Sequence, residues 1–165
     1  MTSTMRFSRP LIGTLVLGAA MILSGSASYA QSAPFVGMAG VWSGGGSITL
    51  DSGASERIRC RATYAVSGDG TGLNQNLVCA SDSYKFNLKS DVVARNGMLS
   101  GTWSEVSRNV TGSLEGRASA GHFNVVVSAP SFTANLSMRT SGNKQSVSIT
   151  SQSQFRGASI SLTRS

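Results

Sequence analysis

Residues 57–80, RIRCRATYAVSGDGTGLNQNLVCA, contain two runs of alternating apolar and polar residues separated by a glycine-rich turn. The first run places five apolar residues on one face: Ile58, Cys60, Ala62, Tyr64 and Val66. The second run returns with Leu73, Leu77 and Cys79 on one face. Alternation with a period of two predicts strands that bury one face, so this segment predicts a β-hairpin.

The same alternation extends over the rest of the chain, from Trp42 to Leu162. About ten strands with short connections are expected in residues 31–165, which form a single domain. We therefore predict an all-β fold, an antiparallel up-and-down meander of about 8–10 strands. A meander of this length tends to close into a barrel, because closure removes its exposed edges. A two-sheet β-sandwich is the alternative.

The strand register can be tested, because facing residues in an antiparallel hairpin have a constant sum of residue numbers. Asn96-Gly97 is a strong signal for a tight turn, and closing a hairpin on it gives a sum of 193. Ala94 then faces Leu99. A sum of 285 for the turn at residues 141–144 likewise matches apolar residues across that hairpin. Both registers are therefore predicted.

The two cysteines of the chain, Cys60 and Cys79, both lie in the segment quoted first. Pairing Val66 with Leu73 across the glycine-rich turn gives a sum of 139, which also places Cys60 directly opposite Cys79. The chain has no Cys-x-x-Cys motif and no histidine near either cysteine, so nothing indicates a redox or metal-binding pair. A structural disulfide is therefore predicted, and the chain-entropy model gives it about 3 kcal/mol of stabilisation.

Residues 1–30 have the pattern of a cleavable signal peptide. Two arginines precede an apolar run from Leu11 to Leu23, and small residues at 28 and 30 allow cleavage after Ala30. The run is about 13 residues long, whereas a membrane-spanning helix needs about 20. No later stretch is long and apolar enough to span a membrane as a helix. We therefore expect a bacterial protein that is exported to the periplasm or secreted.

Gly40-Val41-Trp42 opens the first predicted strand, and Arg164 lies near the end of the last one. Through these residues the chain resembles the calycin superfamily, which includes lipocalins, fatty-acid-binding proteins and avidins. The resemblance implies an up-and-down barrel in which Trp42 packs against Arg164 and seals one end. The mature chain also resembles small secreted proteins of rhizobial bacteria, which implies a location in the cell envelope and indicates no activity.

The predicted inward face combines large aromatic residues with many small ones. The aromatic residues expected to line a ligand site are Tyr64, Phe86, Trp103, Phe123 and Phe132. Small inward residues such as Gly44 and Gly112 either let the barrel flatten and fill itself or leave an apolar cavity. The sequence leaves both interpretations open.

Arg57, Arg59 and Arg61 form an outward stripe on one predicted strand, with neighbours about 7 Å apart. Lys85 and Lys89 lie on the outward face of a nearby strand. Such a surface fits an anionic component of the cell envelope. No aromatic residues interleave with these cations, so nucleic acid is not an expected partner. A solvated strand face that discourages edge pairing is the alternative.

No motif in the chain predicts catalysis, a cofactor or a metal site. His122 is the single histidine and lies outward by alternation, so a catalytic triad is hard to build. Glu105 lies at a strand end, where Arg108 across the turn predicts an ion pair. We therefore expect a non-enzymatic barrel that binds a small apolar ligand or an envelope component. The alternative is an interaction module, or an inhibitor of a secreted enzyme, that acts through the basic surface.

Overall fold

A computed structural model describes residues 33–153 and 155–165. The strands in this part of the chain are β1 (Gly40–Leu50), β2 (Ser55–Val66), β3 (Gly72–Ala80), β4 (Lys85–Arg95), β5 (Met98–Glu105), β6 (Val110–Ser119), β7 (His122–Ala129), β8 (Phe132–Ser141), β9 (Lys144–Ser151) and β10 (Phe155–Arg164). The described residues include no helix that is long and apolar enough to cross a membrane. The signal peptide predicted for residues 1–30, with its cleavage site after Ala30, lies outside the described residues.

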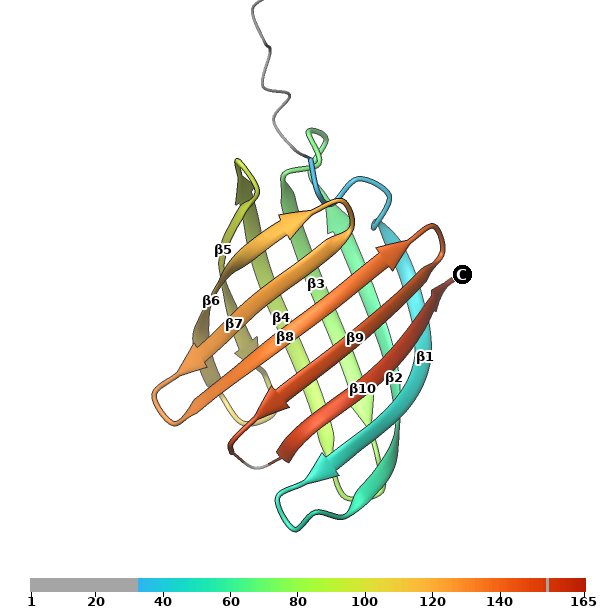
Figure 1. The fold of residues 1–165 in the computed structure, drawn as a ribbon, viewed down its shortest axis with the longest axis vertical. Helices are drawn as coiled ribbons and strands as arrows, with labels where there is room; N and C mark the ends of the chain where they lie inside the picture. Colours follow the sequence, from blue (N-terminus) through green and yellow to red (C-terminus); the bar gives the residue numbers. More distant parts are fainter. Residues whose placement is uncertain (1–32, 154) are drawn as a thin grey trace, which may run out of the picture.

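The ten strands form one closed barrel (Figure 1). Each strand pairs antiparallel with its neighbours in sequence, and β1 also pairs with β10. The predicted up-and-down meander is thereby confirmed. The sandwich alternative is excluded, because a sandwich has two separate sheets and this sheet is continuous around the barrel.

The predicted strand registers are confirmed. Three pairs show it: Ala94 with Leu99, Met138 with Val147, and Cys60 with Cys79. Asn96 and Gly97 have φ angles of 52° and 77°, the left-handed conformations that a tight hairpin turn requires at both central residues. The apolar residues of the strands consequently face the barrel interior.

One end of the barrel is covered by residues 33–39, which we call the N-terminal plug. Phe35 and Met38 lie outside any strand, yet each is only 1% exposed. Phe35 stacks on Phe123 of β7 with ring centroids 5.9 Å apart, and its amide donates to the carbonyl of Gly70 in the β2–β3 turn at 3.2 Å. The plug and the C-terminus lie at the same end of the barrel (Figure 1).

The opposite end contains an aromatic cluster, formed by Tyr84, Phe86, Trp103, Phe132 and Phe155. Neighbouring rings in the cluster have centroids 4.4–6.2 Å apart. Phe155 is 5% exposed and contacts three of the other rings. Apolar groups therefore occupy both ends of the interior.

Candidate functional site

A cavity of about 100 Å³ lies inside the barrel, beneath the N-terminal plug. Phe35 of the plug lines it, together with inward side chains of β2 to β10. The polar side chains in this lining are Tyr64 and Gln75, and no charged side chain lines it. An engineered apolar cavity of about 150 Å³ takes up benzene, so this smaller cavity suits a molecule no larger than about one six-membered ring.

The structure places two of the five predicted lining residues, Tyr64 and Phe123, at this cavity. The other three, Phe86, Trp103 and Phe132, lie outside its lining, in the aromatic cluster at the opposite end. Alternation along a strand tells which side chains point inward, but not how far along the barrel axis each one lies. Barrel strands tilt by about 35–45° to the axis, so residues in one register row lie at different heights.

Several inward apolar side chains remain only half-buried, which decides between a filled and a hollow interior. Leu77, Leu114 and Val147 point inward and line the cavity, yet none of them is fully buried. A close-packed core has few voids larger than a water molecule and would cover these side chains. The interior of this barrel is therefore incompletely filled.

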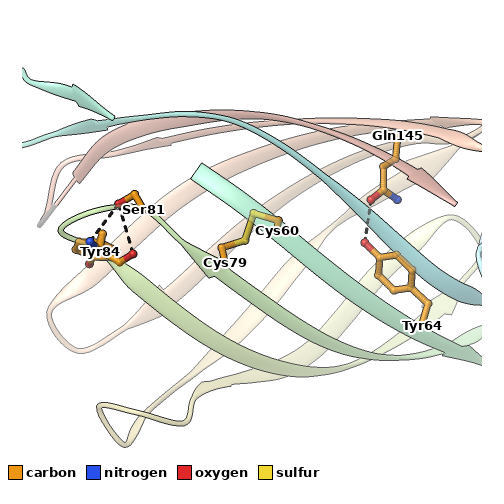
Figure 2. The surroundings of a disulfide bond; sticks show 6 residues. All are labelled: Cys60, Tyr64, Cys79, Ser81, Tyr84 and Gln145. Atoms are coloured by element: carbon orange, nitrogen blue, oxygen red, sulfur yellow. Dashed lines mark hydrogen bonds between the residues drawn. A yellow bond between two sulfur atoms is a disulfide. The ribbon is translucent and has the colours of Figure 1, made fainter. Parts of the chain in front are cut away.

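A hydrogen bond crosses the interior next to the cavity. The Tyr64 hydroxyl of β2 donates to Oε1 of Gln145 of β9 at 2.9 Å, and Figure 2 shows the two side chains pointing toward each other. Nε2 of Gln145 donates in turn to the Thr140 hydroxyl at 3.1 Å. Burial raises the pKa of Tyr64 to about 12, against a lowering contribution from the bond to Gln145. Tyr64 therefore stays neutral at physiological pH.

The predicted disulfide joins Cys60 of β2 to Cys79 of β3 (Figure 2). The two residues are direct register partners with Cα atoms 4.1 Å apart, and they are 5% and 2% exposed. Cys60 also lines the cavity. The bridge therefore fixes the hairpin that forms one part of the cavity wall.

Trp42 and Arg164 are register partners where β1 pairs with β10. The guanidinium carbon of Arg164 lies 5.5 Å from the Trp42 ring centroid, a contact that contributes about 0.5–2 kcal/mol. Nε1 of Trp42 donates to the carbonyl of Met38 at 2.8 Å. Arg164 donates to the carbonyl of Gly37 at 2.7 Å and to Oδ1 of Asn143 at 2.6 Å. The bonds to Gly37 and Met38 hold the plug against the barrel end.

Sequence reasoning missed Phe35, Gln75 and Gln145. The two glutamines share the inward parity of their apolar neighbours in β3 and β9, so strict use of alternation could have found them. Phe35 carries no such signal, because it precedes the first strand and reaches the interior only through the turn that folds the plug over the barrel.

The basic surface consists of Arg57, Arg59 and Arg61 of β2 with Lys85 and Lys89 of β4, all exposed. Ala80 of β3 lies between Arg59 and Lys85 in the register, so only a small side chain separates these two cations. Among the described residues, no hydrogen bond or ion pair engages the charged groups of these five side chains. They therefore form an unneutralised positive face on the outside of the barrel.

Glu105 at the end of β5 is a buried carboxylate with a structural role. It accepts hydrogen bonds from the backbone amides of Asn87 at 2.9 Å and Arg108 at 2.6 Å, and Nη1 of Arg108 lies 3.8 Å away. Burial acts to raise the pKa of Glu105, but the backbone hydrogen bonds and the Arg108 charge outweigh it and lower that pKa. The predicted ion pair between Glu105 and Arg108 is present. The backbone hydrogen bonds lower the pKa of Glu105 more than the Arg108 charge does.

His122 is exposed at the start of β7. Within residues 33–153 and 155–165, no group of three or more histidine, cysteine or acidic side chains could hold a metal ion.

No protein-family model matches the chain, and no curated protein matches its sequence. Several solved structures are similar to it, and two of them are the following. Rv2717c from M. tuberculosis has a TM-score of 0.60 and 15% identity, over 77% of this chain and 92% of that protein. The S-type phycobiliprotein lyase CPES from Guillardia theta has a TM-score of 0.56 and 11% identity, over 79% of this chain and 90% of that protein. Both are barrels of the calycin-like kind, and the chain shares that fold with them.

Proposed function

We propose that this chain is an exported, non-enzymatic barrel protein that binds a small apolar ligand. The observation that carries the proposal is the apolar, incompletely filled cavity beneath the N-terminal plug. Transfer of apolar surface from water into such a site contributes about 25 cal/mol per Å². The predicted signal peptide and the disulfide agree with an oxidising compartment outside the cytoplasm.

A matched pair of neighbouring substitutions tests the cavity. Val125 lines it, whereas Val126 points outward and is 43% exposed. Benzene is expected to raise the Tm of the wild type in a concentration-dependent manner, because a ligand that binds only the folded state stabilises it. Val125→Phe should abolish the rise by filling the cavity, and Val126→Phe should retain it. The absence of any rise in the wild type would contradict the proposal.

Native mass spectrometry of the protein purified from its own periplasm tests export and binding together. We expect a mature chain that begins at Gln31, with a non-covalent ligand that is released unchanged on denaturation. Because one similar barrel is a lyase, release of a converted product would contradict the non-enzymatic part of the proposal. A homogeneous ligand-free mass would count against binding in the cell.

A second candidate function is favoured by the unneutralised basic surface: binding of an anionic partner in the envelope, such as an acidic protein. Unpaired cations gathered on one face attract polyanions, and salt screens the attraction. In a pull-down at low salt, the wild-type protein is expected to retain an envelope partner. The triple variant Arg57→Ser/Arg59→Ser/Arg61→Ser should not retain it. The triple variant Arg95→Ser/Arg117→Ser/Arg139→Ser is the control, because it removes the same charge from exposed positions of β4, β6 and β8. If both triple variants lose the partner equally, binding depends on the net charge of the protein and not on the basic surface.

A further inference from the structure

A row of polar side chains lies on the inward face of the cavity wall. Tyr64, Gln75 and Ser90 are successive register partners on β2, β3 and β4, and they point into an interior that is otherwise mostly apolar. Burial of a polar group is unfavourable unless a hydrogen bond compensates it. Each polar group in the row is therefore stable there only with a hydrogen-bond partner.

Two members of the row are satisfied by protein partners. The Tyr64 hydroxyl donates to Gln145 at 2.9 Å, as described above. The Ser90 hydroxyl, in a residue only 9% exposed, donates to Oε1 of Gln75 at 3.1 Å. This bond also orients the Gln75 amide, because it engages the oxygen and leaves the nitrogen on the other side.

The amide nitrogen of Gln75 has no partner among the described residues. In the same part of the chain, no fully buried side-chain nitrogen or oxygen lacks a hydrogen bond. The Gln75 nitrogen therefore keeps accessible surface, and Gln75 is one of the residues that line the cavity. A glutamine amide nitrogen carries two hydrogens for donation.

The electrostatics of the cavity restrict what this donor can bind. No lysine, arginine, histidine or acidic side chain is among the lining residues. An ionised ligand would lose its hydration without gaining a countercharge, which is strongly unfavourable in an apolar site. A neutral oxygen acceptor would instead form the hydrogen bond that the Gln75 nitrogen lacks.

We infer that the cavity takes a neutral, compact apolar molecule with one oxygen acceptor, such as a ketone, which the Gln75 amide holds. This inference rests on the proposed function and adds the chemical class of the ligand to it. The size limit comes from the cavity volume of about 100 Å³, which sets about one six-membered ring as the upper limit.

Cyclohexanone and methylcyclohexane are the test pair, because they have similar shapes and differ in the carbonyl group. Dissociation constants are measured by NMR titration of the full mature chain. Gln75→Leu is expected to weaken cyclohexanone binding roughly 2- to 12-fold, the range of one net hydrogen bond, and to leave methylcyclohexane binding unchanged or tighter. Leu77→Met, two residues along the same strand and also in the lining, is the control and should affect both compounds alike.

A second readout does not depend on any variant. In the wild type, cyclohexanone should shift the side-chain amide resonances of Gln75, and methylcyclohexane should leave them in place. Cyclohexanecarboxylate at neutral pH should bind much more weakly than cyclohexanone.

The outcomes separate this inference from the proposed function. If neither compound binds the wild type, both fail. If both compounds bind, but Gln75→Leu changes them equally and the Gln75 resonances stay in place, the ligand class is wrong and the apolar site stands. Equal binding of the carboxylate and the ketone would overturn the neutrality of the ligand.

Discussion

Single residues determine the charge balance at the turn between β5 and β6. Glu105 is 5% exposed, a position at which burial disfavours the charged form of a carboxylate. Burial acts to raise the pKa of Glu105, but two backbone hydrogen bonds from Asn87 and Arg108, together with the Arg108 charge, lower it overall. The carboxylate therefore stabilises the folded state only while it is ionised.

The contribution of Glu105 to stability should depend on pH. Because its pKa is lower in the folded state, the stabilisation is fully present above the unfolded value near 4.5 and is lost as the pH falls through the folded value. Glu105→Gln should lower the free energy of unfolding at pH 7 by about 1–3 kcal/mol, and the gap to the wild type should narrow below pH 4.5. Urea unfolding across this pH range measures the difference in unfolding free energy between the variant and the wild type. Glu115→Gln, on the exposed face of β6, is the control. A gap that stays constant with pH would contradict the assignment.

At the scale of elements, the β2–β3 hairpin combines the disulfide, one cavity wall and the basic stripe. Its inward face carries Cys60 and Tyr64, and its outward face carries the three arginines. The disulfide joins residues 19 positions apart, so it restricts a short loop of the unfolded chain. In the chain-entropy model, the bridge stabilises the protein by lowering the entropy of the unfolded state.

Removal of the bridge should destabilise the barrel without changing its fold. The double variant Cys60→Ala/Cys79→Ala is expected to lose about 3 kcal/mol of unfolding free energy, as is the wild type under reducing conditions. Urea denaturation with and without dithiothreitol measures both effects, and the double variant should not respond to the reductant. An unchanged midpoint in the reduced wild type would count against the expected contribution of the disulfide.

At the scale of the whole molecule, the barrel depends on the β1–β10 seam, which joins the first strand to the last. Gly46 of β1 pairs with Ile160 of β10 in this seam. A Cβ at position 46 would collide with the carbonyl oxygen of Ser159 and lie 2.9 Å from the Ile160 Cα. Only a glycine allows the two backbones to approach so closely.

Gly46→Ala should therefore weaken closure of the barrel. Overpacking of this kind costs about 1–3 kcal/mol. We expect a lower Tm and faster amide hydrogen exchange in β1 and β10 than in β5 and β6. Gly68→Ala is the control, because a Cβ there would meet nothing within 4 Å. Equal exchange in all four strands would argue against a local effect on the seam.

The sequence by itself determined which side chains face inward and how neighbouring strands pair. Alternation with a period of two is a local property, and a tight turn such as Asn96-Gly97 fixes the register of its hairpin without help from distant residues. For the same reason the pairing of Cys60 with Cys79 followed from one turn and the parity of two short runs. The inward parity of Gln75 was also readable, although the apolar pattern around it concealed it.

Only the tertiary structure decided which inward residues share one level of the barrel. Tyr64 and Trp103 belong to one register row, yet Tyr64 lines the cavity and Trp103 lies in the aromatic cluster at the other end. Strand tilt displaces such a row along the barrel axis, and closure of the whole sheet sets that tilt. The position of Phe35 over the cavity depends in turn on the plug folding across the finished barrel end. The cavity therefore results from closure of the whole sheet, which no local pattern of residues predicts.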